Sequence, residues 1–580
     1  MSELTGKAAN LPMLKRVFKY VKPYRNKFLF TFLMTLALAG LSISRPMLIQ
    51  YAVDNAIITP NPDLLFTMSI ILVGILLVEA CMYYLYTFSA NWIGQSVILD
   101  LRNEIYAHIN SLKLKYFDQT PIGTLVTRVV SDIETISDIF SNGILVIFGD
   151  IVKLVAIVIV LFIVDVELTL ITMSTIPILL VATYFFKNGI RSAFQTVRNQ
   201  VSKLNAFLQE HITGMHIVQV FGREKREMGR FISINADHRD AHIKSVWYYA
   251  VFMPIVEILS STSVAMVVWW GAHGVLEGTV TIGHLLEFIL FIHMMFRPIR
   301  EMADKFNTLQ MGIVSSERVF KLLDTTETIE DTGSHPIEKL SGKIEFEHIY
   351  LSYKDDDLVL KDLSFTVEPG QTLALVGATG SGKTSIINLL GRFYEYQEGT
   401  IKVDGIDVKD IRVNDLRSRM AVVLQDVFLF SDSVMNNITL NDPTISDEDV
   451  ITAAKEFGIY DFIMKLPGGF QYDVKERGAM LSVGQRQLIS FVRAYVHKPD
   501  ILILDEATSS IDTESEHIIQ RALEKLTQGR TSIVIAHRLA TIQKADKILV
   551  LEKGQVVESG SHEELMAHGG HYQNLFELQF

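Results

Sequence analysis

Residues 377–384 read Gly-Ala-Thr-Gly-Ser-Gly-Lys-Thr and form the most specific motif in the chain. They fit the pattern G-x-x-x-x-G-K-[ST], in which glycines allow a tight turn and backbone N–H groups surround a phosphate chain. The apolar run 372–376 before the motif predicts a strand. Residues 385–390 after it predict a helix, whose N-terminus adds positive partial charge. This context argues against a chance glycine-rich turn and predicts a nucleotide site.

The motif also assigns individual roles around the phosphates. Lys383 is expected on the β- and γ-phosphates, and the Thr384 hydroxyl is expected on Mg²⁺. The other residues of the motif and its helix that are expected to line the nucleotide are Gly377, Thr379, Gly380, Ser381, Gly382 and Ser385.

A second apolar run, residues 501–504, ends in Asp505 and Glu506. We expect a buried strand that brings both carboxylates to the sheet edge where the phosphate loop lies. Asp505 can hold Mg²⁺, directly or indirectly, and Glu506 can orient or deprotonate the attacking water. The alternative is an exposed strand end, but the position after a phosphate loop favours catalysis.

The composition points to a membrane part joined to a soluble part. Of the 580 residues, 49% are hydrophobic, and the mean hydropathy is positive. The net charge of −12 argues against a nucleic-acid partner. The one cysteine, Cys81, excludes an intrachain disulfide.

Six apolar segments precede residue 310, and each approaches or exceeds the roughly 20 residues that cross a hydrocarbon core. They lie at about 28–51, 64–88, 143–164, 166–186, 249–272 and 280–296. The third and fourth segments nearly touch, so Asp165 and its neighbours must form a tight turn between antiparallel spans.

A polar run follows residue 323, and from about residue 342 short apolar strands alternate with helices, which is typical of a mostly parallel α/β sheet. The expected fold is an α-helical membrane domain followed by an α/β P-loop NTPase domain. The expected boundaries are 1–27 for an N-terminal tail and interfacial helix, 28–320 for the transmembrane domain, 321–341 for a linker and 342–580 for the nucleotide-binding domain.

Positive charges in the connecting segments predict the orientation. Lys and Arg residues are concentrated in the N-terminal tail and after the second and fourth spans, whereas residues 54–63 and 165–167 contain none. The positive-inside rule then places both termini in the cytoplasm. Helices buried in a soluble core would not produce this alternation. We therefore expect a multi-pass protein of the cell membrane, in contact with membrane lipids, and specifically of a bacterial inner membrane.

Two helical patterns extend the membrane domain. Leu14, Val17, Phe18 and Val21 fall on one face of a basic helix, which suits the inner membrane surface, although a soluble amphipathic helix is the alternative. Periodic apolar positions after the second span predict that the helices continue well beyond the membrane and offer a contact surface to a cytoplasmic domain.

Charged residues within or close to the spans are costly in lipid and usually face a cavity or a partner. They are Glu79, Asp150, Lys153, Glu257, Glu287 and Arg297. Asp150 and Lys153 are spaced to pair on one helix face. For the glutamates, a substrate contact and a helix–helix hydrogen bond are both open. His284 and His293 are expected to be packing residues rather than metal ligands.

Leu481-Ser-Val-Gly-Gln485, before the Asp505 strand, resembles the signature motif of ATP-binding cassette (ABC) transporters. With one nucleotide domain behind six spans, nearly the whole chain resembles an ABC half-transporter of the exporter type. Residues 117–132 and 214–224 look like the two intracellular coupling segments of that family.

The resemblance implies ATP and Mg²⁺ as cofactors and assigns further residues. Tyr353 matches the aromatic residue that stacks on adenine. Gln425 matches the glutamine that touches Mg²⁺ or water, and His537 the histidine that contacts the γ-phosphate. Together with Glu506, these two form the expected catalytic set. The residues implied to close on the ATP of another subunit are Ser482, Gly484, Gln485 and Asp512.

Position 483 departs from the family, whose signature is usually Leu-Ser-Gly-Gly-Gln, because it is valine here. A β-branched residue disfavours positive φ and a close backbone approach. We expect the valine to be tolerated, because the other nucleotide-site residues are intact.

One phosphate loop and one signature per chain imply a dimer with two ATP sites in its interface. The expected activity is ATP-driven export or flipping of a small hydrophobic or amphipathic substrate by alternating access. A homodimer is favoured by the intact catalytic residues, and one half of a heterodimer is the alternative. An ATP-gated channel or regulator, and a protease-linked peptide exporter, are further alternatives.

Overall fold

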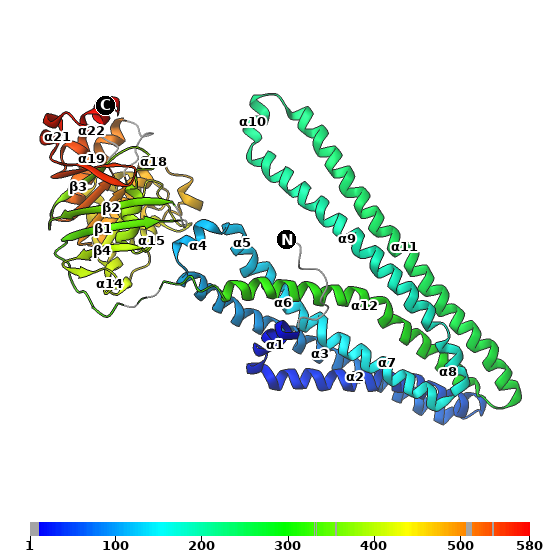
Figure 1. The fold of residues 1–580 in the computed structure, drawn as a ribbon. Helices are drawn as coiled ribbons and strands as arrows, with labels where there is room; N and C mark the ends of the chain where they lie inside the picture. The colour runs from blue at the N-terminus through cyan, green and yellow to red at the C-terminus, as the bar shows by residue number, and fades with distance from the viewer. Residues whose placement is uncertain are drawn as a thin grey trace. The chain divides into compact units, whose positions relative to one another are not determined.

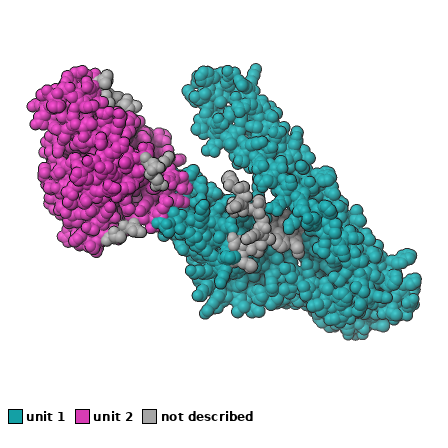
Figure 2. All heavy atoms as spheres, in the orientation of Figure 1, with its two compact units in different colours: residues 1–110, 121–326 teal, residues 111–120, 327–580 magenta. Residues whose placement is uncertain are grey.

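The structure is a computed structural model that describes residues 11–329, 331, 333–353, 357–505, 513–535 and 539–579. It divides into two compact units (Figure 2). The first contains residues 1–110 and 121–326, and the second contains residues 111–120 and 327–580. The short segment 111–120 therefore leaves the helices that flank it and joins the second unit.

The first unit is helical. Its helices are α1 (Leu11–Lys19), α2 (Arg25–Ala52), α3 (Pro62–Ser111), α5 (Ile122–Thr127), α6 (Ile133–Asp138), α7 (Ile144–Val164), α8 (Val166–Met173), α9 (Ile176–Thr213), α10 (Met215–Val220), α11 (Glu224–Glu277) and α12 (Ile282–Leu323). Short π-helical segments at Val53–Ile58, Arg128–Asp132 and Ile139–Gly143 interrupt this order.

Six helical stretches among the described residues are long and apolar enough to cross a membrane, as the sequence predicts. Four of the helices are much longer than the roughly 20 residues that a bilayer needs. α3 has 50 residues, α9 has 38, α11 has 54 and α12 has 42. These helices are therefore longer than a span requires, and their extension beyond the membrane stays a prediction.

The connections between spans use local caps. Asp165 separates α7 from α8, and its carboxylate accepts a hydrogen bond from the Leu168 backbone N–H at 2.8 Å. Gly278, with φ of 75°, ends α11, since glycine adopts this left-handed conformation without strain. Thr281 then caps the first turn of α12. The predicted tight turn at Asp165 is therefore present.

Helix α1 packs its apolar face on the first unit. Val17 and Val21 are buried, the Phe18 ring meets Phe140 edge to face, and Arg16 forms an ion pair with Asp324 at 2.6 Å. Protein therefore covers much of the face that the sequence assigns to the membrane surface, and the interfacial position stays a prediction.

Helices α9 and α11 run side by side over most of their length (Figure 1). Near α8 their packing includes Phe186 stacked on Phe252, with the ring centroids 4.1 Å apart. Figure 1 shows the pair diverging from the other helices of its unit toward α10, which lies at the tip. There Met215, Ile217, Val220 and Phe221 are exposed.

The second unit contains two sheets. Its strands are β1 (Ile344–Ser352), β2 (Leu358–Val367), β3 (Thr372–Val376), β4 (Glu398–Val403), β5 (Ile406–Asp407), β6 (Met420–Val423), β7 (Ile501–Asp505), β8 (Thr531–Ile535), β9 (Lys547–Glu552) and β10 (Gln555–Gly560). The order is β2-β1-β4-β5 in an antiparallel sheet and β10-β9-β3-β8-β7-β6 in a sheet that is parallel except at β10.

Helices surround these sheets. They are α4 (Leu114–Gln119), α13 (Lys383–Leu390), α14 (Val413–Ser418), α15 (Val434–Thr439), α16 (Asp447–Glu456), α17 (Tyr460–Met464), α18 (Val483–Val496), α19 (Thr513–Thr527), α20 (Leu539–Gln543), α21 (His562–His568) and α22 (His571–Gln579). The strands predicted before the phosphate loop and before Asp505 are confirmed as β3 and β7.

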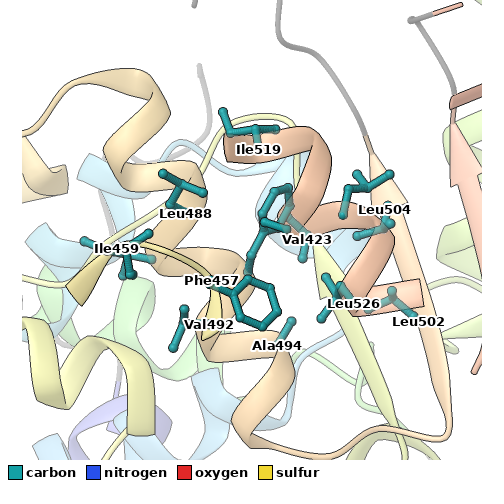
Figure 3. Packing of buried hydrophobic residues seen from close by; sticks show 14 of the residues in the cluster. Val423, Phe457, Ile459, Leu488, Val492, Ala494, Leu502, Leu504, Ile519 and Leu526 are labelled. Atoms are coloured by element: carbon teal, nitrogen blue, oxygen red, sulfur yellow. The ribbon is translucent and has the colours of Figure 1, made fainter. Parts of the chain in front are cut away.

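Alternate residues of the parallel strands face two separate cores, because successive side chains of a strand point to opposite faces. In β7, Leu502 and Leu504 join a core with α18 and α19, whereas Ile501 and Ile503 join the core shared with the antiparallel sheet. Figure 3 shows the first core, where Leu526 of α19 lies near Leu502 and Val492 of α18 lies near Phe457. Apolar surface on both faces explains the continuous apolar runs in the sequence.

Strand β8 lies between β3 and β7, so its core residues hold the phosphate-loop strand in register with the Asp505 strand. We expect Ile533→Ala, at a fully buried position of β8, to destabilise the protein by about 2–5 kcal/mol through lost burial and a residual cavity. The measurement is the Tm of the detergent-purified chain. Val557→Ala, at an exposed position of β10, is the control and should change stability by less than about 0.5 kcal/mol. Equal Tm values for the two variants would contradict this.

Candidate functional site

The candidate site lies at the carboxyl edge of the parallel sheet. The phosphate loop follows β3, Asp505 ends β7, and Gln425 follows β6. Because β3, β8, β7 and β6 are parallel neighbours, their carboxyl ends meet at one edge. The structure thus brings together the phosphate loop and two of the side chains that the sequence assigns to it.

The phosphate loop requires its glycines. Gly380 and Gly382 have φ of 83° and 104°, values that favour glycine. A Cβ at Gly377 would lie 2.3 Å from the Leu551 carbonyl oxygen, and one at Gly382 would lie 2.6 Å from the Leu360 side chain. The loop therefore keeps its backbone N–H groups free of side-chain cover, which is what close approach of a phosphate needs.

Two polar side chains of the loop, Lys383 and Ser381, are able to bind an anion. The Lys383 ammonium donates to the carbonyl oxygens of Gly377 and Ala378, at 2.7 and 3.0 Å. Burial lowers the pKa of Lys383, and the negative charge of Asp505 opposes that shift. The Ser381 hydroxyl is shielded and has no hydrogen-bond partner in the part of the chain that the structure describes. A triphosphate would supply acceptors for both groups.

Two hydroxyls follow the loop at the start of α13. The Thr384 side chain is exposed, so it is open to a metal ion bound beside the phosphates, and Ser385 is buried. Asp505 is half-buried and close enough to act on Lys383, and Gln425 is exposed after β6. Oxygen donors of this kind suit Mg²⁺, which prefers carboxylate, hydroxyl and phosphate ligands. These residues fit a Mg–nucleotide complex.

Three predicted site residues lie outside the described residues. They are Glu506, Asp512 and His537. The strands that lead toward the first and third of them are described: β7 ends at Asp505, and β8 ends at Ile535.

Tyr353, the expected adenine-stacking residue, follows β1. Its hydroxyl donates to the Ser385 hydroxyl at 3.0 Å, so the ring lies beside the start of α13. The Tyr394 ring contacts it edge to face, with centroids 4.8 Å apart. The structure thus adds Tyr394 to the candidate site, a residue that the sequence analysis does not single out.

Tyr394 also contacts the segment 111–120. Its hydroxyl donates to the Asp118 carboxylate on α4, and the neighbouring Glu395 forms an ion pair with Lys113 at 3.4 Å. Burial, and then the hydrogen bond to Asp118, raise the pKa of Tyr394, so the phenol stays protonated as the donor. A continuous set of contacts therefore joins Ser385, Tyr353, Tyr394 and Asp118.

The signature residues form the N-terminus of α18. Ser482 caps the helix: its hydroxyl accepts from the Gln485 backbone N–H at 3.2 Å, and the Gln485 side chain accepts from the Ser482 N–H at 2.9 Å. This reciprocal cap explains the serine and the glutamine locally. A helix N-terminus also favours an anion, which agrees with the role implied for the signature.

Val483 is the first residue of α18 and is not among the described residues with positive φ. Its side chain is 45% exposed. The backbone of this conformation therefore does not require glycine at position 483. The penalty of a β-branched residue at positive φ does not apply to it.

The charged residues of the spans pair differently from the sequence expectation. Asp150 accepts from Lys305 of α12 at 2.5 Å instead of pairing with Lys153. Glu79 forms an ion pair with Arg45 of α2 at 3.2 Å. Asp150 and Glu79 therefore pair with residues on neighbouring helices. Sequence spacing within one helix does not identify such partners.

Comparisons with known proteins cover both units. Residues 28–299 match the profile of the ABC transporter transmembrane region, and residues 360–509 match that of the ABC transporter ATPase family. The chain is 40% identical to the uncharacterized ABC transporter ATP-binding protein YknV of Bacillus subtilis, over 100% of this chain and 96% of that protein.

Other relatives have more specific names. The chain is 35% identical to an ATP-dependent lipid A-core flippase of Syntrophus aciditrophicus, over 98% of this chain and 95% of that one. It is 34% identical to a putative multidrug export ATP-binding/permease protein of Staphylococcus aureus, over 98% and 100%. A solved structure of a bacterial Atm1-family ABC exporter with ATP bound matches with a TM-score of 0.78 and 27% identity, over 96% and 98% of the two chains.

The buried position of Lys383 in the phosphate loop leads to a prediction about nucleotide turnover. We expect Lys383→Ala to lower nucleotide turnover by about a hundredfold or more, because a positive charge that stabilises the transferring phosphoryl group is lost. Turnover is measured as phosphate release by the purified chain. Lys402→Ala is the matched control, since Lys402 pairs with Glu347 on the exposed side of β4, at 2.8 Å, and should leave turnover unchanged. Equal turnover in Lys383→Ala and wild type would refute the phosphate-site assignment.

A second prediction concerns the contact between Tyr394 and α4. Tyr394→Phe keeps the ring beside Tyr353 but removes a hydrogen bond to a carboxylate, worth about 1 kcal/mol at this exposed position. Amide hydrogen exchange of residues 114–119 should become faster, while the Kd for ATP changes less than about twofold.

Tyr396→Phe is the control for that measurement. The Tyr396 hydroxyl donates to Asp407 at 3.3 Å, away from α4, so exchange of residues 114–119 should stay at the wild-type rate. Unchanged exchange in Tyr394→Phe, or an equal effect in both variants, would show that the phenol does not hold α4.

Proposed function

The chain belongs to the ABC transporter family, and we propose that it exports or flips a hydrophobic or amphipathic substrate by alternating access, as a dimer with two interfacial ATP sites. It is a multi-pass membrane protein with an ATPase domain in the same chain. The observation that carries the proposal is this fusion, matched over nearly the full length to exporters and a flippase.

The proposed chemistry is hydrolysis of ATP at the carboxyl edge of the parallel sheet. Lys383 and the backbone of the phosphate loop would hold the β- and γ-phosphates, and Tyr353 would stack on the adenine. Glu506 would orient or deprotonate the attacking water, assisted by Gln425 and His537. Mg²⁺, held by Thr384, Asp505 and Gln425, would neutralise charge on the phosphates when bound.

Two features favour a dimer. Ser482 and Gln485 at the N-terminus of α18 offer an anion site that would close on the ATP of another copy, together with Gly484 and Asp512. Helix α10 presents Met215, Ile217 and Val220 to solvent at the tip of the α9–α11 pair. Apolar side chains in that position suit contact with a nucleotide-binding domain.

ATP would then act by its differential affinity for the closed dimer. Closure would pull on the segment 111–120 through Tyr394 and Asp118, and hydrolysis would reset the cycle. The intact catalytic residues favour a homodimer. One half of a heterodimer, and an ATP-gated channel or regulator, are the alternatives.

The orientation proposed from the positive-inside rule places both termini in the cytoplasm. On that basis the nucleotide site faces cellular ATP, and the turns at Val53–Asn61 and Gly278–Thr281 face the opposite side of the membrane. A bacterial inner membrane agrees with the bacterial relatives.

The mixed lining of a groove in the first unit supports an amphipathic substrate or lipid. The groove has a volume of about 650 Å³ between α8 and α11, and its residues include Met266, Trp269, Trp270 and Glu167. The Trp270 indole N–H donates to the Glu167 carboxylate at 3.4 Å. Aromatic faces with one acidic group suit a molecule that is apolar at one end and polar at the other.

The test is ATPase activity of the chain purified alone and reconstituted in lipid. We expect activity without a second gene product. We also expect Glu506→Gln to lower turnover by about 10²–10⁴-fold while retaining bound nucleotide, because binding residues remain and the base is lost. Glu524→Gln, at a surface position of α19, is the control and should behave as wild type. Activity that appears only with a second chain would establish the heterodimer, and full activity of Glu506→Gln would refute its role.

A further inference from the structure

Glu287 is a buried carboxyl group within a span, and the proposed transport cycle does not use it. It lies in the second turn of α12 and is 2% exposed. Its Oε1 atom is shielded and has no hydrogen-bond partner among the described residues. A buried carboxylate without a partner is expensive in a membrane, so such a residue usually carries a function.

The face of α12 that bears Glu287 is turned toward Asp54. Gly283, one turn earlier on the same face, donates its backbone N–H to Asp54 Oδ1 at 2.8 Å. A Cβ at Gly283 would lie 2.5 Å from Asp54 Oδ2, so the approach is as close as glycine allows.

The other partners of Asp54 are neutral. Its Oδ2 accepts from the Gln50 amide and from the Thr281 hydroxyl, each at 2.6 Å. Neutral donors therefore hold Asp54 against the face of α12 that also bears Glu287.

A hydrogen-bonded path leads from Asp54 to the surface. The Thr281 hydroxyl has one hydrogen, which it donates to Asp54, so its oxygen must accept from His284 Nδ1, 3.0 Å away. The Thr281 side chain is exposed, and His284 is partly exposed. Chains of His, hydroxyl and carboxyl groups of this kind relay protons in membrane proteins.

Several charged residues of the neighbouring helices pair with one another. Arg45 of α2 pairs with Glu79 of α3, and Asp150 of α7 pairs with Lys305. No group of three His, Cys, Asp or Glu residues able to hold a metal ion occurs among the described residues. A proton needs neither space nor further ligands, so it is the ligand that suits a fully buried carboxyl group.

We propose that Glu287 is a proton-binding site reached from the loop end of α12 through His284, Thr281 and Asp54. One proton from solvent forms an O–H bond on the Glu287 carboxylate, which becomes neutral, and no other covalent bond changes. Conformations that bury Glu287 bind this proton, and conformations that expose its carboxyl group to water release the proton. The transport cycle is therefore linked to pH. With both termini in the cytoplasm, as in the proposed function, the loop end of α12 faces the external side of the membrane. The proton site itself does not depend on that orientation.

The test is infrared difference spectroscopy of the full-length chain in lipid during a pH titration without nucleotide. The wild type should gain a carboxylic-acid C=O signal on acidification that is lost in Glu287→Gln. Glu257→Gln, which removes an exposed glutamate of the neighbouring α11, should keep the signal. ATPase activity of the same samples is measured in parallel, and its pH dependence should be flatter in Glu287→Gln than in Glu257→Gln.

The path is tested separately from the site. Thr281→Val removes the bridging hydroxyl at nearly equal volume and should slow proton uptake after a pH jump without abolishing the C=O signal. Thr281→Ser should restore the wild-type rate. An identical titration in wild type and Glu287→Gln would overturn the proposal, and normal ATPase activity in those samples would show that the transporter function stands without it. A wild-type rate in Thr281→Val would overturn the path.

Discussion

Parallel pairing of β3, β8 and β7 is the constraint on which the ATPase unit depends. Their register aligns Leu373 with Ile533 and Ile533 with Ile503, so the phosphate loop and Asp505 must emerge at one edge. The pairing is stabilised from both faces, because alternate side chains of each strand enter separate cores. Function then rests on loops that a rigid sheet positions, whereas the loops themselves add little to stability.

The contacts of Tyr394 connect that edge to α4, in the segment of chain between α3 and α5. Its ring contacts Tyr353 and its hydroxyl donates to Asp118 of α4, so a single residue lies between Tyr353 and α4. The segment 111–120, between α3 and α5, packs with the ATPase unit and not with the helices that flank it. The segment is joined covalently to α3 on one side and to α5 on the other.

Local patterns in the sequence predicted the parts that local physics determines. The phosphate loop, strands β3 and β7, the turn at Asp165 and the six spans follow from turn chemistry and apolar periodicity. Ser482 of the signature is expected only to contact ATP, although the spacing Ser-x-x-Gln also predicts the capping box that the structure contains at the start of α18. Contacts such as Tyr394 with Asp118, 276 residues apart, and Asp150 with Lys305 depend on tertiary packing, and no spacing rule identifies them.

The central claim is that ATP closes two copies of the ATPase unit upon each other. Because Cys81 is the one cysteine in the chain, Cys81→Ser provides a background for a single spin label at His568→Cys, an exposed position of α21. Electron–electron distance measurements between labels on two copies should give a shorter and narrower distribution with MgATP than without nucleotide. In Lys383→Ala the distribution should not respond to MgATP. Absence of any dipolar coupling, or the same distribution with and without MgATP in the parent protein, would contradict the account.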